Sequence, residues 1–307
     1  MRILLKVLLG LLLIVVLGVA ALFGWIYHQV ESFDTVTLPA RHGQVEQQLF
    51  LGGGERQPLI VGFGGAEGGN AWASEHWQAQ RQRFLDQGYA FLALGYFGAP
   101  TTPAQLDRIS LDALHAAIQQ AATHPQIESR CIALLGGSKG AELALALGSR
   151  YSDIGAVVGL VPAHAVFAAH TDAMTTSSWS HQGEPLPFAP VPWSATLPLL
   201  AGDIRGAYEA IMADESALAE AEIAVENLAG PLLLVSATRD EMWPSREMAD
   251  RIIRRLAERG FGHSAKHLPI EGGHAEPLKH FDAVEAFLAE EFQQPCLSQN
   301  PPAVAAN

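Results

Sequence analysis

The sequence predicts an α/β fold built on a mostly parallel, doubly wound sheet. Apolar runs of strand length alternate along the chain with segments of helix length, an order that places helices on both faces of a parallel sheet. The runs are almost continuously apolar, as strands buried on both faces require. One long stretch between two of the runs breaks this alternation and indicates an inserted region.

The first element is an apolar run of bilayer length. No charged side chain occurs in residues 7–26, and a helix of that length spans ~30 Å, the thickness of a bilayer core. Arg2 and Lys6 precede the run and acidic residues follow it, which places the N-terminus in the cytoplasm. We therefore expect residues 1–27 to anchor the protein, with the catalytic domain on the extracytoplasmic (periplasmic or extracellular) side.

A cleaved signal peptide is the main alternative for this segment, and a buried soluble helix is another. Signal cores are usually shorter and end in small residues at a cleavage site. Here the small pair Ala20-Ala21 lies inside the run, and Phe23, Trp25 and Tyr27 follow it. Aromatic residues at that position are typical of the membrane–water interface, so an uncleaved anchor is favoured.

The remaining elements form one domain over residues 28–294. Residues 28–57 contain a run of glycines and predict a short β-hairpin. Strands are predicted at 58–64, 90–96, 131–136, 156–161, 232–237 and 265–270, and helices at 73–87, 103–124, 139–150, 245–259 and 277–292. Residues 163–227 predict a cap inserted over the strand ends, and residues 295–307 a disordered tail.

Composition excludes several classes of function. The formal net charge is −13, which argues against nucleic acid as a partner. Two cysteines are too few for a disulfide scaffold or a multi-cysteine zinc module. No spacing typical of a metal site, a dinucleotide fold or a phosphate-binding loop occurs, so no metal and no cofactor are expected.

The motif that predicts a catalytic activity is GGSKG at residues 136–140, between a predicted strand and a predicted helix. This G-x-S-x-G pattern is typical of a sharp turn that exposes a serine nucleophile above an α/β-hydrolase sheet. Ser138 is therefore the candidate nucleophile. The alternative is a glycine-rich turn in which Ser138 only caps the helix.

A serine nucleophile needs a base and an orienting acid, which in α/β-hydrolases follow in the order Ser, Asp/Glu, His. Asp240 comes just after the predicted strand 232–237, and His274 just after the predicted strand 265–270. We therefore expect Asp240 to be the acid, with Glu241 as the main alternative, and His274 to be the base.

The oxyanion formed during acyl transfer needs two backbone N–H groups. We expect one from Lys139, the residue after the nucleophile. The other is expected from the glycine-rich loop after strand 58–64, at Gly65 or, alternatively, Ala66.

Further runs carry a resemblance to a known family: LALGYFG at 92–98, GSKGAELAL at 137–145 and DEMWPS at 240–245. Over about residues 58–292 the chain resembles the C-terminal catalytic domain shared by acyl-CoA thioester hydrolases and bile-acid-CoA:amino acid N-acyltransferases. The eukaryotic members have an immunoglobulin-like domain before this one, whereas about 30 residues separate the apolar run from the first central strand here.

The resemblance implies an α/β-hydrolase fold with Ser138 in the nucleophile's position, Asp240 in the acid's and His274 in the base's. The family's thioesterases have serine at this position and its amino acid acyltransferases have cysteine, so the resemblance favours transfer of the acyl group to water.

We therefore expect a membrane-anchored serine hydrolase that cleaves a small-molecule acyl ester or thioester. Trp179, Phe188 and Trp193 of the insertion are candidates for an acyl pocket, or form a core of the insertion itself. The alternatives are transfer of the acyl group to an amine or alcohol, and a non-catalytic surface protein that binds acyl ligands. The leaving group, coenzyme A included, and the oligomeric state stay open.

Overall fold

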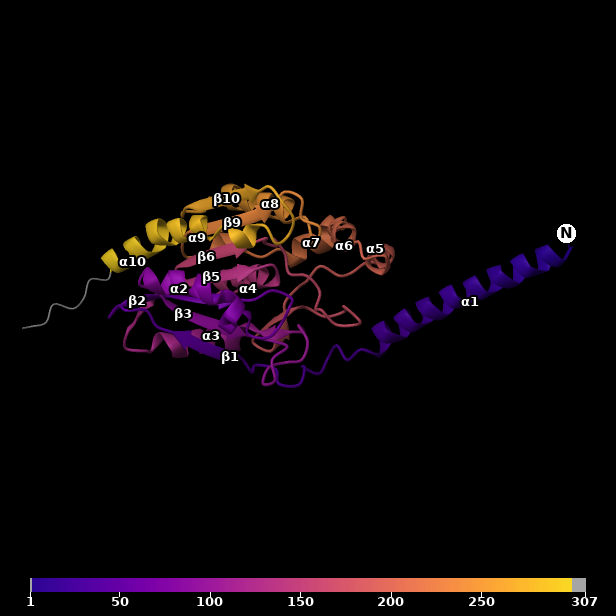
Figure 1. Cartoon of the computed structure of the whole chain (residues 1–307), viewed down its shortest axis with the longest axis horizontal. Coiled ribbons are helices and arrows are strands. Elements are labelled where there is room, and N and C mark those ends of the chain that lie inside the picture. Colours follow the sequence, from indigo (N-terminus) through magenta and orange to yellow (C-terminus); the bar gives the residue numbers. More distant parts are fainter. Residues whose placement is uncertain (1, 300–307) are drawn as a thin grey trace, which may run out of the picture.

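A seven-stranded sheet forms the centre of the protein in the computed structural model, which describes residues 2–299 (Figure 1). The strand order is β1-β3-β2-β5-β6-β9-β10, and all neighbours are parallel except β1 and β3. The strands are β1 (Glu46–Phe50), β2 (Gln57–Phe63), β3 (Ala90–Gly95), β5 (Ile127–Gly137), β6 (Ala156–Leu160), β9 (Leu232–Ala237) and β10 (Ala265–Ile270). This confirms the α/β-hydrolase fold.

Helices cover both faces of the sheet, each face with its own apolar core. One face is covered by α3 (Leu111–Ala122), α4 (Lys139–Gly148) and α8 (Ser245–Glu258). The other is covered by α2 (Gln78–Asp86), α9 (Phe281–Phe287) and α10 (Gln294–Gln299), with a π-helical segment, Leu288–Gln293, joining the last two. Burial of the central strands β2, β3, β6 and β9 on both faces explains why their sequences are continuously apolar.

The predicted hairpin before the first central strand is wrong. Strand β1 pairs antiparallel with β3, with Glu46 opposite Gly95. Strand β2 is fully buried between β3 and β5, so both of its edges are already paired. The half-exposed β1 therefore occupies the edge of the sheet beyond β3.

The stretch predicted as a cap, residues 163–227, lies between β6 and β9. It holds β7 (Trp179–His181), β8 (Glu184–Pro185), α5 (Thr196–Ala201), α6 (Ile204–Met212) and α7 (Glu215–Ala221). Strand β7 also pairs with β4 (Ile109–Ser110), which ties the cap to the main domain. Apolar cap residues pack with Trp243 and Met248, which follow β9, in a third cluster above the carboxyl ends of the strands.

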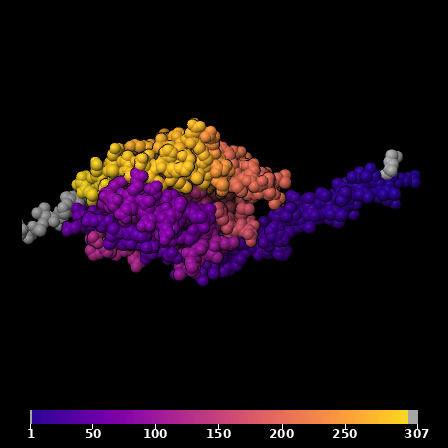
Figure 2. Space-filling view, viewed as in Figure 1, coloured from indigo at the N-terminus to yellow at the C-terminus, as the bar shows by residue number. Residues whose placement is uncertain are grey.

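The N-terminal helix α1 (Arg2–Ser32) leaves the domain as an arm beside the cap (Figure 2). None of its 31 residues is buried. Among residues 2–299 it is the one helix long and apolar enough to cross a membrane, a test that a signal sequence also passes. At 1.5 Å per residue it is ~46 Å long, which exceeds a bilayer core.

A disulfide joins Cys131 in the middle of β5 to Cys296 in α10. This pairing links positions 165 residues apart and was not predicted from the sequence. Residues 295–299, predicted as part of a disordered tail, are instead helical and tied to the central strand by this bond. The remainder of the predicted tail, 300–307, lies outside the described residues.

We expect Cys296→Ala to lower the free energy of unfolding by about 2–5 kcal/mol, because the disulfide restricts the unfolded chain over a long loop. Urea denaturation of the variant and of the wild type measures this loss. Wild-type protein unfolded in the presence of a reductant should match the variant. Equal stability of oxidised wild type and variant would contradict the prediction.

Candidate active site

Ser138 occupies a strained turn between β5 and α4. Its backbone angles are φ 54° and ψ −121°, a region that costs a non-glycine residue on the order of 1–3 kcal/mol. The Ser138 N–H donates to the Leu160 carbonyl at 2.9 Å, which secures the turn to the neighbouring strand. The geometry is that of a nucleophile elbow, in which the strain presents the serine hydroxyl above the sheet.

The two glycines that complete the G-x-S-x-G motif are required by close backbone contacts. A Cβ on Gly136 would lie 2.0 Å from the Gly140 carbonyl oxygen. A Cβ on Gly140 would lie 2.3 Å from the Gly64 carbonyl oxygen. The turn can therefore pack against itself and against the loop after β2 only without side chains at these positions.

His274 and Asp240 meet after the carboxyl ends of β10 and β9. His274 Nδ1 lies 2.8 Å from Asp240 Oδ1, and the Asp240 side chain is fully buried. Burial by itself would raise the pKa of Asp240, but hydrogen bonds, that of His274 first, outweigh it and hold the pKa below its usual range. The carboxylate thus stays charged and can orient the imidazole with Nδ1 protonated.

Glu241, the alternative acid, has a different contact. Its Oε2 accepts the backbone N–H of His274 at 2.9 Å, and its side chain is exposed. Glu241 thus holds the loop that carries His274, whereas Asp240 contacts the imidazole ring itself.

The backbone N–H groups predicted to bind the oxyanion differ in whether they already have a hydrogen-bond partner. Lys139 is the first residue of α4, and N–H groups of a first helical turn have no partner within the helix. The Gly65 N–H donates to Glu67 Oε1 at 3.0 Å and is therefore already engaged. Ala66, the alternative, lines both cavities that Ser138 borders.

A buried ion pair beneath the elbow was not predicted from the sequence. Lys139 Nζ donates to both carboxylate oxygens of Glu142, at 2.8 and 2.7 Å, and both side chains are almost fully buried. Glu142 Oε1 also accepts Trp179 Nε1–H at 2.7 Å and the Phe167 N–H at 3.2 Å. The first turn of α4 is thereby tied to the cap. The i,i+3 spacing of Lys139 and Glu142 on an otherwise apolar helix was the available signal.

Two cavities meet at Ser138. The smaller has a volume of about 240 Å³, and Ser138, His274, Trp72, Trp77 and Leu278 contribute to its wall. The cap cavity, of about 460 Å³, runs from Ser138 beneath the cap, lined by mainly apolar residues that include Phe167, Val191, Leu199, Tyr208 and Ile211. Both contain Ala66 and Met242, so they are continuous past the candidate nucleophile.

The three aromatic residues predicted for an acyl pocket lie in different places. Trp179 is fully buried, contacts Glu142, and is not among the residues that line the two cavities at Ser138. Phe188 packs against the main core and is likewise absent from both walls. Trp193 is 57% exposed on the outer side of the cap, where it lines a third cavity. None of the three lines either cavity at Ser138.

No group of three or more His, Cys, Asp or Glu side chains that could hold a metal ion occurs within the described residues. Neither cavity at Ser138 therefore has a ligand set for a metal in this part of the chain.

His164, at the start of the cap, is a buried imidazole whose two ring nitrogens have no hydrogen-bond partner. Desolvation, with a smaller contribution from Arg251, lowers its pKa to about 3. The folded protein thus keeps it neutral, whereas the unfolded chain binds a proton below its ordinary value of 6.5. Stability is therefore lost as pH falls from about 6.5 towards 3.

Below about pH 6.5, we expect His164→Leu to reduce the pH dependence of the free energy of unfolding by up to about 1.4 kcal/mol per pH unit. Urea denaturation of wild type and variant at pH 7, 6, 5 and 4 measures the slope. His263, whose side chain is exposed, offers a matched control, because its replacement by leucine should leave the slope unchanged. Parallel slopes for wild type and His164→Leu would contradict the prediction.

Comparison with known proteins identifies the family. Residues 109–293, more than half of the chain, match the family model described as BAAT / Acyl-CoA thioester hydrolase C terminal. The chain belongs to this family. Relatives in Mus musculus include the mitochondrial acyl-coenzyme A thioesterase 2, 27% identical over 230 residues, which cover 73% of this chain and 46% of that protein. Acyl-coenzyme A amino acid N-acyltransferase 1 is 23% identical over 256 residues, 76% of this chain and 57% of that protein.

The chain spans only about a quarter to somewhat over half the length of the curated relatives it matches. Among solved structures, a puromycin-hydrolyzing peptidase of Mycobacterium tuberculosis aligns with a TM-score of 0.57 at 17% identity, over 85% of this chain and 38% of that one. At that identity the likeness shows the fold alone. The relatives in Mus musculus thus include both a thioesterase and an acyltransferase.

Proposed function

We propose that the protein is a serine hydrolase that cleaves an acyl ester or thioester with Ser138, His274 and Asp240. The observation that carries this proposal is the 2.8 Å contact of His274 Nδ1 with the buried Asp240, in a wall that His274 shares with the strained Ser138. Membership of a family that includes acyl-CoA thioesterases supports an acyl substrate.

In this mechanism Ser138 Oγ attacks the substrate carbonyl while His274 Nε2 takes the serine proton. Asp240 accepts Nδ1–H and stabilises the imidazolium that forms. The imidazolium then protonates the departing alcohol or thiol, which leaves an acyl group on Ser138. Water, deprotonated by His274, then attacks the acyl carbonyl. The bond to Ser138 Oγ breaks, the imidazolium returns the proton to Ser138 Oγ, and the carboxylic acid is released.

The oxyanion that forms in both steps would be held by the backbone N–H groups of Lys139 and Ala66. We place the second donor at Ala66 instead of Gly65, because the Gly65 N–H donates to Glu67. Donors built into the backbone are already oriented, so they stabilise the developing charge without reorganisation.

We also propose that α1 anchors the protein and that the domain faces an extracytoplasmic compartment. The charge pattern around α1 supports this orientation. The disulfide between Cys131 and Cys296 supports it independently, because disulfides persist in oxidising compartments and are rare in the cytosol.

Labelling with a fluorophosphonate probe tests the proposal directly. Wild-type protein should bind one probe at Ser138, identified by peptide mass spectrometry, and should hydrolyse nitrophenyl esters or acyl-CoA. Ser138→Ala should lose both properties while keeping its unfolding transition. Folded protein that is not labelled, with Ser138→Ala equal to wild type in activity, would overturn the proposal.

Acyl transfer is a second candidate function, favoured by the similarity to an amino acid N-acyltransferase. The same acyl-enzyme would then be attacked by an amine or alcohol instead of water. Product analysis with and without glycine, taurine or simple alcohols distinguishes the two. Free acid as the sole product under all conditions would exclude transfer to these acceptors.

A further inference from the structure

Exposed apolar side chains gather at one end of the catalytic domain. Outside α1, the large hydrophobic residues exposed among those described are Val36, Trp193, Leu197, Leu200 and Met242. Val36 follows α1, three of the others lie in or just before the cap helix α5, and Met242 borders both cavities at Ser138. Concentration of exposed apolar side chains at one place marks an interaction surface.

The cap segment that carries this surface is uncharged. From residue 186 to residue 202 no Asp, Glu, Lys or Arg occurs, although the protein as a whole is acidic. Leu197 is 69% exposed and Leu200 is 53% exposed on α5. An uncharged apolar face is suited to the lipid boundary of a membrane, where a charged face would pay for desolvation.

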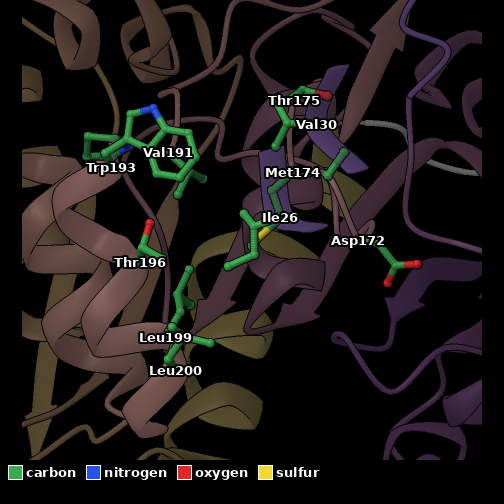
Figure 3. Close-up of a pocket in the computed structure, with 12 residues that line it drawn as sticks. Ile26, Val30, Asp172, Met174, Thr175, Val191, Trp193, Thr196, Leu199 and Leu200 are labelled. Carbon is green, nitrogen blue, oxygen red and sulfur yellow. The ribbon is translucent and has the colours of Figure 1, made fainter. Parts of the chain in front are cut away.

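The end of α1 lies beside this surface. The uncharged run of α1 ends at Ile26, and Ile26, Gln29 and Val30 are its half-buried residues. Ile26 and Val30 lie opposite Trp193, Leu199 and Leu200 across a cavity of about 260 Å³, the anchor cavity (Figure 3).

Because the bilayer-length part of α1 ends beside the anchor cavity, the cap next to it would lie where the helix leaves the bilayer. In the whole molecule, α5 and the end of α1 lie at the same end of the domain, opposite α10 (Figure 1).

The anchor cavity adjoins the cap cavity, which Ser138 lines. It has Asp172, Met174, Val191 and Leu199 in common with the cap cavity, which reaches Ser138. The two adjoining cavities, taken together as a mainly apolar route, have the end of α1 at one end and Ser138 at the other.

The walls of this route offer no free positive charge. Lys139 is the one Lys or Arg in the two walls, and it is buried in its pair with Glu142. Asp172 adds a negative charge. The pKa of His170 is lowered by desolvation and by Lys139, so the imidazole is neutral at pH 7. An uncharged acyl chain fits such walls better than a polyanionic leaving group does.

We infer that the cap docks on the leaflet from which α1 emerges, and that the substrate is an uncharged acyl ester resident in that leaflet, whose acyl chain enters through the anchor and cap cavities. This inference rests on the proposed serine hydrolase function and on α1 as an anchor. The membrane would then be both the partner of the exposed apolar surface and the source of the substrate.

Docking is tested without catalysis. The full chain is reconstituted into phosphatidylcholine vesicles with an environment-sensitive fluorophore on Leu197→Cys, which the native disulfide leaves as the single free thiol. Nitroxide-labelled lipids should quench this probe at least threefold more than a probe on Ala257→Cys. Ala257 is an exposed residue in the last turn of α8, which leads back to the opposite end of the sheet. Equal, weak quenching at both positions would overturn docking.

Entry from the bilayer is tested by comparing two substrates. A long-chain umbelliferyl ester dissolved in the vesicles and a soluble umbelliferyl acetate are supplied to the full chain, to Leu197→Glu and to the matched control Ala257→Glu. Leu197→Glu should lower the ratio of vesicle to soluble rate at least fivefold, whereas Ala257→Glu should leave it unchanged. An unchanged ratio in Leu197→Glu would overturn entry through the docked cap.

Different results would overturn the membrane docking and the serine hydrolase function. Turnover of neither ester, with no labelling of Ser138, overturns the serine hydrolase proposal and the acyl substrate with it, while quenching still decides docking. Turnover of soluble ester with weak quenching at position 197 supports the hydrolase and overturns the membrane docking.

Discussion

Replacing Asp240 by asparagine is expected to lower kcat on the order of 10⁴-fold without loss of the fold. The amide keeps the size of the carboxylate, which lies 2.8 Å from His274 Nδ1. It loses the charge that stabilises the imidazolium formed when His274 takes the proton from Ser138. Steady-state kinetics with a nitrophenyl ester, together with a thermal unfolding curve, measure both parts of the expectation.

Glu241→Gln is the matched control, because it removes a neighbouring carboxylate that contacts the His274 backbone and not its ring. A glutamine oxygen can still accept that N–H, so the expected loss of kcat is less than tenfold. The reverse order of effects, with Glu241→Gln the more damaging, would assign the acid to Glu241.

The second large effect is expected on stability. Glu142→Gln should lower the free energy of unfolding by about 3–5 kcal/mol, because it leaves the Lys139 ammonium buried without a counter-charge. For a domain of this size the melting temperature should fall on the order of 10 °C. Urea and thermal denaturation followed by circular dichroism measure both quantities.

Two further variants show whether this loss comes from the buried charge. Lys139→Met combined with Glu142→Gln removes the unpaired ammonium and should recover at least half of the loss. Glu209→Gln breaks the exposed pair with Arg205 on α6 and should cost less than about 1 kcal/mol. A double variant as unstable as Glu142→Gln would attribute the loss to packing instead of charge.

The central strands could be predicted because the pattern that specifies them is local. Each buried parallel strand carries its own continuous apolar run, so the runs at 58–64 and 232–237 match β2 and β9 closely. The pairing of β1 could not be predicted in the same way. It depends on which strand edges the rest of the sheet leaves free, and sequence neighbours do not determine that.

The residues of the candidate site also differ in whether the sequence could predict them. Ser138, Asp240 and His274 were found from the sequence, because each follows a strand in a turn with a recognisable pattern. Their assignment as a catalytic triad is still a prediction, now supported by the contact of His274 with Asp240. The placement of Trp179 beside Glu142 had no local signal, since the two positions are 37 residues apart.

The sequence by itself determined the doubly wound α/β class, the apolar N-terminal run and the order of the three candidate catalytic residues. Tertiary structure decided which backbone N–H stays free, because the Glu67 carboxylate accepts that of Gly65. It also decided that Cys131 meets Cys296, and that the end of α1 and the cap line a common cavity. Secondary structure is specified by the backbone preferences and the apolar pattern of neighbouring residues, which the sequence shows directly. Cavities and long-range contacts form only when distant segments pack together.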